Sequence, residues 1–317
     1  MKFTTLLFVF TGITAILAWP ACRFGTPPTS PPLPLFEFNP KKVTELTLIK
    51  NDPETQDHWS TRLKRSDSNL WEMAASSTDS SEHPELHDRR ADSNYILHLL
   101  DALKSLRAPK NTAPPQASET TLGLSPPWFT LRWQALTQIY EIQIGAQVPQ
   151  SKARYARESA RGVFVAEGAF LGVLGHLSSF EKLRETKLLD LPSEDVDEFE
   201  IRAGGKLLLY AQRDGDDWVD RKHKHLPERV PRLLEELTQI RINKFIDTPD
   251  LLERAQKDLK AHPKFMALLK DRHGNPTAVT IARIGKKTLG TTSSRKNQIF
   301  EIDGEKIELM VLTPNRL

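Results

Sequence analysis

Two histidine pairs have spacings that could serve metal binding. His83 and His87 are four residues apart, with acidic residues around them. On a helix this spacing would place both imidazoles on one face, as a metal site requires. Pro84 interrupts the segment, and the H-E-x-x-H signature of metalloproteases is missing. The sequence therefore favours a solvated polar loop here.

The second pair, His223 and His225, belongs to the basic run 221–225, RKHKH. Two residues apart on a strand, both imidazoles would share a face. The neighbouring lysines and arginine would repel a metal cation, so we interpret the run as a solvated basic face. No metal ligand is predicted anywhere in the chain.

Motifs for covalent or nucleotide chemistry are incomplete. Ser179 and Lys182 have the S-x-x-K spacing of serine acyl-transferring enzymes, but the supporting S-D-N and K-T-G elements are missing. The glycines at 168, 172 and 175 do not form G-x-G-x-x-G, and Gly285-Lys286 lacks the earlier P-loop glycine. We therefore predict no catalytic residue and no cofactor, and we expect a protein that is not an enzyme.

Two further groups have both a binding and a structural interpretation. Trp71 and Trp218 could stack on a glycan, but their equivalent places in the two halves of the chain favour core packing. Arg154, Arg157 and Arg161 could bind anions. A charged, exposed strand edge is the interpretation we favour for these arginines.

Composition limits the class of protein. A length of 317 residues predicts two units, or one unit used twice. The net charge of +3 is too balanced for nucleic acid to be the main partner. A single cysteine excludes an internal disulfide framework and any zinc site that needs two or more cysteines.

The amino terminus predicts the compartment. Residues 3–22 form a run of 20 residues without a charge, about the thickness of a bilayer's hydrocarbon core. The single cysteine, Cys22, ends this run directly after Ala21, as lipoprotein processing requires. An uncleaved membrane anchor, lipidation at Cys22 and plain signal cleavage all remain open. Each of them places the body outside the cytoplasm, in the periplasm, behind a proline-rich linker over 23–34.

The first half of the body reads as strands followed by a helix. A strand is predicted over 43–49, and apolar spacings of three and four predict a helix that Asp92 caps and Pro109 stops. The other elements predicted in this half are strands over 71–74, 129–133, 140–144 and 163–165, and a helix over 169–177.

The second half repeats much of this order. Gly204-Gly205 predicts a hairpin turn between strands 199–203 and 206–212. Val230, Leu233 and Leu237 mark one face of a following helix, with Pro231 in its first turn. The remaining elements predicted are a helix over 250–259 and strands over 278–284, 298–302 and 306–312.

An alignment of the halves pairs Val43 with Val196, Trp71 with Trp218, and 128–133 with 277–282. We therefore expect an α+β fold of two related units, each a mainly antiparallel sheet with a packed helix. The predicted boundaries are an anchor or signal over 1–22, the linker over 23–34, and units over 35–192 and 193–317.

Several short motifs occur in a characteristic order. They are L-F-x-F-x-P at 35–40, D-x-x-x-I-x-x-L-L-x-x-L at 92–103, L-G-L-x-P-P at 122–127 and L-R-x-x-x-L-L-x-L at 183–191. In this order the chain resembles DUF4340, a bacterial family of unknown function. The histidine-rich insert 80–90 and the basic run 221–225 depart from the family pattern.

The resemblance implies an anchored extracytoplasmic protein and brings no catalytic residues with it. Members look like companions of ABC-2-type transport systems, so we expect a non-enzymatic accessory that contacts the membrane and a permease and ATPase complex. The alternative is an envelope ligand-binding module or hydrolase whose site is assembled from distant residues. That alternative would bring His58, His83 and His87 together with a carboxylate in one cleft.

Overall fold

The computed structural model describes residues 34–53, 55–56, 58–67, 69–78, 89–107, 117–226, 229–261, 265–295 and 298–303. The apolar run, Cys22, the linker up to residue 33, the His83–His87 pair and the predicted strand 306–312 lie outside these ranges. Within them, none of the helices has both the length and the apolar character needed to cross a membrane.

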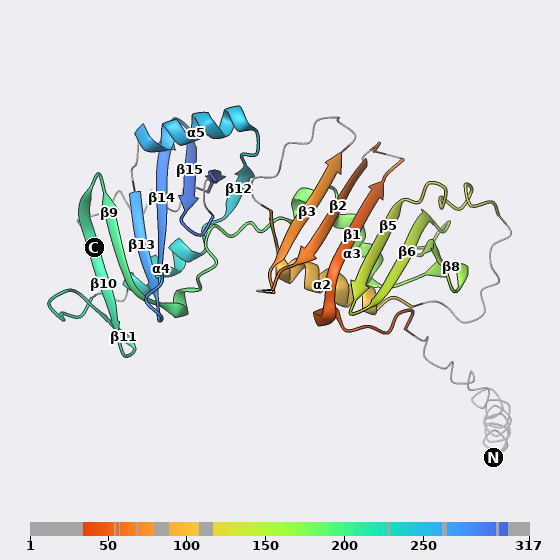
Figure 1. Ribbon diagram of the computed structural model, residues 1–317, viewed down its shortest axis with the longest axis horizontal. Helices are drawn as coiled ribbons and strands as arrows, with labels where there is room; N and C mark the ends of the chain where they lie inside the picture. Colours follow the sequence, from red (N-terminus) through yellow and green to blue (C-terminus); the bar gives the residue numbers. More distant parts are fainter. Residues whose placement is uncertain are drawn as a thin grey trace, which may run out of the picture.

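The first sheet has eight antiparallel strands in the order β4-β3-β2-β1-β5-β6-β7-β8. Helices α2 (Ser93–Lys104) and α3 (Ala169–His176) pack with the core face of this sheet (Figure 1). The strands are β1 (Val43–Asn51), β2 (His58–Arg65), β3 (Trp71–Thr78), β4 (Arg90–Ala91), β5 (Phe129–Ala135), β6 (Gln138–Gln147), β7 (Arg154–Glu158) and β8 (Gly162–Ala166). We call this sheet with α2 and α3 the first unit.

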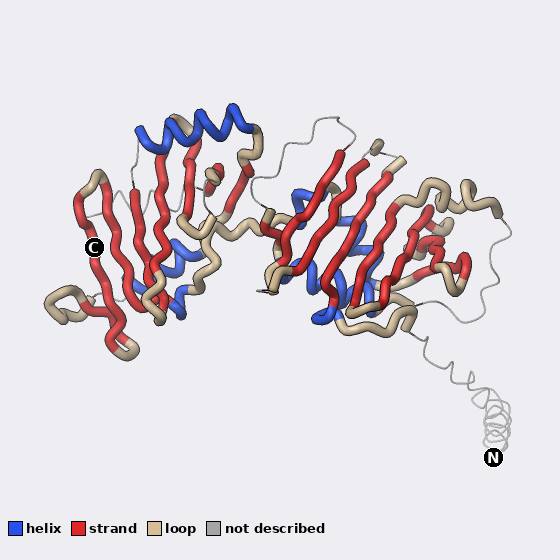
Figure 2. Tube along the Cα trace, viewed as in Figure 1, coloured by secondary structure: helices blue, strands red, loops and turns tan. Residues whose placement is uncertain are grey.

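The second sheet also has eight antiparallel strands, in the order β11-β10-β9-β13-β14-β15-β16-β12. Helices α4 (Arg229–Thr238) and α5 (Pro249–Ala261) belong to it (Figure 2). The strands are β9 (Val196–Ala203), β10 (Lys206–Asp214), β11 (Asp217–Val219), β12 (Ile242–Phe245), β13 (Phe265–Asp271), β14 (Pro276–Ile284), β15 (Lys287–Thr292) and β16 (Phe300–Ile302). We call this sheet with α4 and α5 the second unit. The α+β class is thus confirmed.

The two sheets share the order of their central strands. In each, three strands form a meander, and a later strand returns to pair with the first strand of the meander: β5 follows β4 and α2 in the first sheet, and β13 follows α4, β12 and α5 in the second. The register repeats as well: Leu46 faces Trp133 between β1 and β5, and Phe199 faces Leu269 between β9 and β13. Val43 and Val196 each begin the first strand of their sheet, as predicted.

One part of the predicted alignment is wrong. The structural counterpart of β5 is β13, which begins at Phe265, and not the strand at 277–282 that the alignment chose. The segment 277–282 lies in β14, which corresponds to β6, the next strand along the first sheet. The sequence prediction contained no strand at β13, so it matched β5 with the following one.

The helices begin and pack for local reasons. Asp92 caps α2, as predicted, because its carboxylate accepts hydrogen bonds from the backbone N–H groups of Asn94 and Tyr95, both at 3.0 Å. Helix α4 packs with Ile281 in the main core of the second unit. Helix α5 packs with Ala282 instead, the next residue along β14. Because successive residues of a strand face opposite sides, α5 and α4 cover opposite faces of the second sheet.

Candidate functional site

The described residues among those singled out by sequence do not form one site, while His83 and His87 lie outside the described ranges. His58 begins β2, where its Nδ1 atom is hydrogen-bonded to the side-chain oxygen of Asn51. His223 and His225 are exposed in the turn after β11, in agreement with the predicted basic face. Among the residues that the structure describes, no group of three or more His, Cys, Asp or Glu could hold a metal ion.

The S-x-x-K spacing is part of a short turn. Ser179 precedes the 3-10 helix η2 (Phe180–Leu183), and its carbonyl oxygen accepts a hydrogen bond from the backbone N–H of Lys182 at 3.3 Å. The Lys182 side chain is exposed. Both tryptophans belong to the cores, as predicted: Trp71 is 3% exposed and Trp218 is 5% exposed.

The predicted role of the arginine group needs correction. Strand β7, which carries Arg154 and Arg157, lies between β6 and β8 and is not an edge strand. Arg157 instead forms an ion pair with Glu119, and Arg161 donates to the carbonyl oxygen of Leu35 at 3.3 Å. Arg154 instead lines a cleft of the first unit.

That cleft, here called the Lys50 cleft, has a volume of about 750 Å³ and lies where β1 ends and β2 and β7 begin. Such a volume is in the range of small-molecule sites. The lining residues are Lys50, Asn51, Asp52, Pro53, Gln56, His58, Thr120, Gly123, Ser125, Pro126, Trp128, Ala146, Gln147, Arg154 and Gly175.

Basic side chains dominate the charges of the Lys50 cleft. The Lys50 side chain is 6% exposed, and its Nζ atom lies 3.5 Å from a carboxylate oxygen of Asp52. The guanidinium of Arg154 lies 3.7 Å from the centre of the Trp128 ring and donates to the Gly145 carbonyl oxygen at 2.9 Å. Among the residues that the structure describes, two permanent cations and one carboxylate therefore line the cleft, together with His58.

The L-G-L-x-P-P motif forms one wall of the Lys50 cleft, through Gly123, Ser125 and Pro126. Gly123 has a φ of +64°, and a Cβ atom there would lie 2.7 Å from the backbone nitrogen of Ala146. The peptide bond between Ser125 and Pro126 is cis. This wall requires glycine because the backbone conformation and the close approach to β6 both exclude a side chain.

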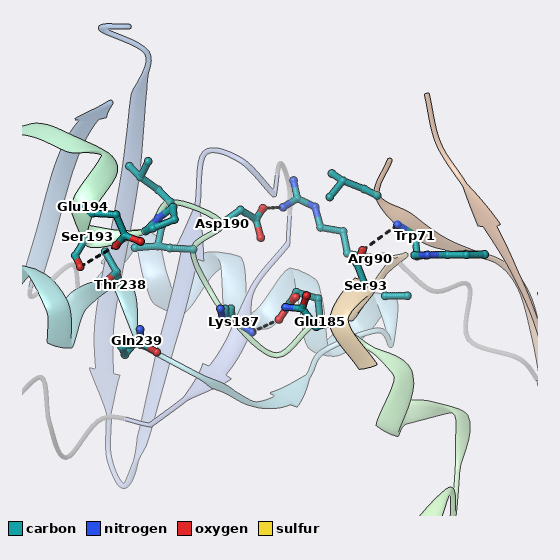
Figure 3. Close-up of a pocket in the computed structure, with 16 residues that line it drawn as sticks. Trp71, Arg90, Ser93, Glu185, Lys187, Asp190, Ser193, Glu194, Thr238 and Gln239 are labelled. Atoms are coloured by element: carbon teal, nitrogen blue, oxygen red, sulfur yellow. Dashed lines mark hydrogen bonds and ion pairs between the residues drawn. The ribbon is translucent and has the colours of Figure 1, made fainter. Parts of the chain in front are cut away.

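A second cleft, the junction cleft, lies between the two units and has a volume of about 390 Å³. Figure 3 shows Arg90 of β4 reaching toward Asp190, with which it forms an ion pair. The connecting segment 185–194 forms much of its lining, and Thr238 and Gln239 at the end of α4 complete it. Among the described lining residues, Arg90 and Lys187 are accompanied by the carboxylates of Glu185, Asp190 and Glu194, so these residues have no excess of cations.

Two buried arginines tie the units together beside the junction cleft. Arg184 is 1% exposed, and its guanidinium donates to Asp247 and lies 3.5 Å from the centre of the Phe245 ring. Arg295 is 2% exposed and donates to the carbonyl oxygens of Glu185 at 3.2 Å and Lys187 at 2.5 Å. Arg184, directly before the connecting segment, thus contacts the second unit, and Arg295 of the second unit contacts the segment itself. The junction between the units is therefore packed.

The face of the first sheet opposite α2 and α3, here called the open face, is polar. It contains a shallow groove of about 470 Å³. Arg62 donates from Nε to the Glu45 carboxylate at 2.6 Å, and this hydrogen bond lowers the pKa of Glu45 from its ordinary value. Ile139 is 56% exposed on the same face. The groove is lined by Glu45, Thr47, Ile49, Arg62, Thr130, Arg132, Trp133, Gln134, Ile139 and Glu141.

The sequence analysis did not identify Lys50 of the Lys50 cleft or Arg184 beside the junction cleft. The predicted strand ended at Ile49, whereas β1 continues through Lys50 to Asn51, and Arg184 was part of a leucine motif only. The alternating pattern of the strand could have identified Lys50. Leu46, Leu48 and Lys50 are two residues apart, so their side chains point to the same, buried side of β1. A cation at an inward position is unusual and marks a site.

A comparison with protein families found one match. The family described as a domain of unknown function, DUF4340, matches residues 82–262. This stretch runs from the insert before β4 to the end of α5 and includes the junction and much of both units. No curated protein and no solved structure matches the chain.

Proposed function

The chain belongs to the DUF4340 family, and from this premise we propose that it is a membrane-anchored, extracytoplasmic accessory protein of an ABC-2-type transport system. Its role in this proposal is to bind a protein partner and not to catalyse a reaction. The transport system follows the family resemblance, and the uncharged run 3–22 supports an anchor at the amino terminus.

The observation that carries the proposal is the packed junction. Arg184 and Arg295 bury their guanidinium groups where the two units meet. The two sheets therefore lie beside each other in one elongated body (Figure 1). A body of this kind can hold two distant surfaces at a fixed separation. That property serves a scaffold or docking protein, which must position a partner relative to the membrane.

The open face of the first sheet is the surface we assign to the partner. It combines exposed charges at Arg62 and Arg132 with the exposed apolar side chain of Ile139. Protein interfaces commonly mix arginine and apolar contacts in this way. Neither α2 nor α3 covers this face, since both pack in the core on the other side of the sheet.

The test is crosslinking of the tagged full-length chain in its native membranes, followed by affinity isolation and mass spectrometry. We expect an ABC permease and its ATPase in amounts comparable to the bait. The variants Arg132→Glu and Ile139→Asp should each reduce this recovery, because reversed charge or a buried carboxylate disfavours the interface. Leu251→Asp is the matched control, since Leu251 is 51% exposed on α5 of the second unit.

Two results would contradict the proposal. One is recovery of the bait without a permease or ATPase. The other is equal loss of recovery in Leu251→Asp and Ile139→Asp, which would show that the open face has no special role. Thermal unfolding of each variant must first show that the fold is intact.

The location of the protein is tested separately. We expect a protease added outside the inner membrane to degrade the body while a cytoplasmic marker stays intact. The intact mass of the mature chain then decides the fate of the amino terminus: a full-length mass indicates a retained anchor, and an acylated chain that begins at Cys22 indicates lipidation. Protection of the body from protease would refute the extracytoplasmic location.

A ligand-binding module is the second candidate function. The Lys50 cleft favours it, because a concave polar site with unbalanced positive charge is a feature of small-molecule binding sites.

A further inference from the structure

We propose that the Lys50 cleft binds a small ligand through a phosphate group. This inference does not depend on a transporter partner, because it rests on the side chains of the first unit alone. A ligand in this cleft would occupy the end of the first sheet, beside the L-G-L-x-P-P wall and away from both the junction cleft and the open face.

The charge of the lining residues is the first argument. Lys50 and Arg154 are permanent cations, whereas Asp52 is the one carboxylate among the described residues that line the cleft. A concave site with an excess of one charge concentrates ions of the opposite sign, so the cleft attracts anions.

The burial of Lys50 is the second argument. Removing an ammonium group from water is costly, and the nearest carboxylate oxygen of Asp52 lies 3.5 Å away, longer than a close charge-assisted hydrogen bond. The Lys50 side chain is nevertheless held at 6% exposure, on the inward face of β1. An oxyanion bound in the cleft would add negative charge near the Lys50 ammonium group and so stabilise this buried cation.

The geometry of Arg154 is the third argument. Its guanidinium lies over the Trp128 ring, 3.7 Å from the ring centre, and its bond to the Gly145 carbonyl oxygen fixes the group further. A guanidinium held in this way presents its N–H donors with little loss of side-chain freedom. The hydroxyl groups of Thr120 and Ser125 line the same cleft and can donate to phosphate oxygens.

These features favour phosphate over carboxylate. A phosphate monoester carries close to two negative charges and three acceptor oxygens, which match two permanent cations and two hydroxyl donors. The volume of about 750 Å³ exceeds what an inorganic ion needs, so we expect an organic group attached to the phosphate.

The test uses the full-length chain in a non-ionic detergent, with inorganic phosphate as the probe in equilibrium dialysis. We expect saturable binding, with acetate competing at least about tenfold less well. Absence of saturable binding would overturn the proposal. Equal competition by acetate would overturn the phosphate assignment, because it would show that the site recognises any small oxyanion.

Three variants assign the binding to the cleft. Arg154→Gln and Lys50→Met should each weaken phosphate binding by about tenfold or more, because each removes one cation. Asp52→Asn should tighten binding, because it removes the competing carboxylate, and a damaged fold would not produce such a gain. Arg132→Gln on the open face is the matched control and should bind phosphate as the unmodified chain does.

The unfolding transition of each variant identifies damage to the fold. Lys50→Met is the variant at risk, since Lys50 is buried, so Arg154→Gln and Asp52→Asn keep the proposal falsifiable. Unchanged phosphate binding in Arg154→Gln together with no gain in Asp52→Asn would overturn it.

The phosphate group can come from a soluble metabolite or from a phospholipid headgroup. Phosphate binding is therefore repeated with vesicles of phosphatidylcholine or of phosphatidic acid. If only phosphatidic acid displaces the phosphate, the site takes a lipid headgroup with an exposed monoester. If neither kind of vesicle displaces the bound phosphate, the ligand is a soluble phosphate compound. Either of these two results supports recognition of a phosphate group.

Discussion

Arg184 and Asp247 are joined across the two units by a hydrogen bond of 3.0 Å between Nη2 and Oδ1. The Arg184 side chain is completely buried and that of Asp247 is 12% exposed. Arg184 follows the helical turn η2 of the first unit, and Asp247 lies between β12 and α5 of the second. The buried charge of Arg184 therefore has two partners: Glu181 of its own unit, at 3.1 Å, and Asp247, which the other unit supplies.

This dependence predicts a large effect of substitution. Arg184→Ala should lower the free energy of unfolding by about 3–5 kcal/mol, because Asp247 would keep a largely buried charge without its cation. Arg90→Ala at the same junction should lower it by no more than about 1 kcal/mol, because the Arg90–Asp190 pair is partly exposed, at 28% and 45%. Urea unfolding curves of the two variants measure both losses in the free energy of unfolding. Losses of similar size would contradict the prediction.

The wall of the Lys50 cleft predicts a contrast between two glycines. A Cβ atom on Gly145 would lie 2.3 Å from the carbonyl oxygen of Leu122, whereas one on Gly172 would meet no atom within 4 Å. Gly145→Ala should therefore destabilise the protein by about 1–3 kcal/mol. Gly172→Ala, inside α3, should stabilise it by about 0.5–1 kcal/mol because alanine favours the helix. Thermal unfolding shifts in the same direction for both variants would refute this account.

A turn aspartate predicts acid sensitivity. Asp271 accepts hydrogen bonds from the Asn275 side chain and from the backbone N–H groups of Asn275 and His273, all at 2.8 Å. These bonds hold the pKa of Asp271 below its ordinary value of 3.8. The unfolded chain has the ordinary value, so the contribution to stability is complete above about pH 4 and is lost as pH falls through the lower folded pKa. A carboxyl NMR titration of Asp271 checks this, and a midpoint at or above 3.8 would contradict it.

The repeated topology predicts that equivalent tryptophans have equivalent roles. Trp71→Ala and Trp218→Ala should each cost about 3–5 kcal/mol, because each empties a core position at the start of the third strand of its sheet. Urea unfolding of the two variants measures both losses. A loss below 1 kcal/mol for either one would show that its indole contributes little to the core.

Local patterns in the sequence were sufficient for many elements of the fold. The helix capped by Asp92 was predictable because cap, apolar spacing and terminating proline agree. The hairpin at Gly204-Gly205 was predictable because both glycines have positive φ, which the turn requires. Each of these signals lies within a few residues of the element that it specifies.

Two strands showed no clear pattern in the sequence. The strand Phe265–Asp271 was missed because its residues form a nearly continuous apolar run, although in the structure Met266 is 45% exposed between the buried Phe265 and Ala267. His58–Arg65 was missed for the opposite reason. The charges of Arg62 and Lys64, which point to the open face, obscured the inward alternation of Trp59, Thr61 and Leu63.

The clefts could not be predicted from the sequence, because their residues come together only through the topology. Lys50 and Arg154 lie on β1 and β7, which β5 and β6 separate in the sheet. The turn that holds Trp128 and the close approach of Gly123 to Ala146 bring them to one cleft. No local pattern specifies such a juxtaposition.

The repeated strand order also has a consequence for folding kinetics. In each sheet the central pair joins strands far apart in the chain, as in the pairing of Leu46 with Trp133. The three-strand meander can form early, but the inner edge of its first strand stays unpaired until β5 forms in the first unit, after α2, or β13 forms in the second, after α4, β12 and α5. During that interval each half of the chain presents an open, apolar β edge. Refolding yield should therefore fall as protein concentration rises, because another chain can pair with that edge before the chain's own strand arrives.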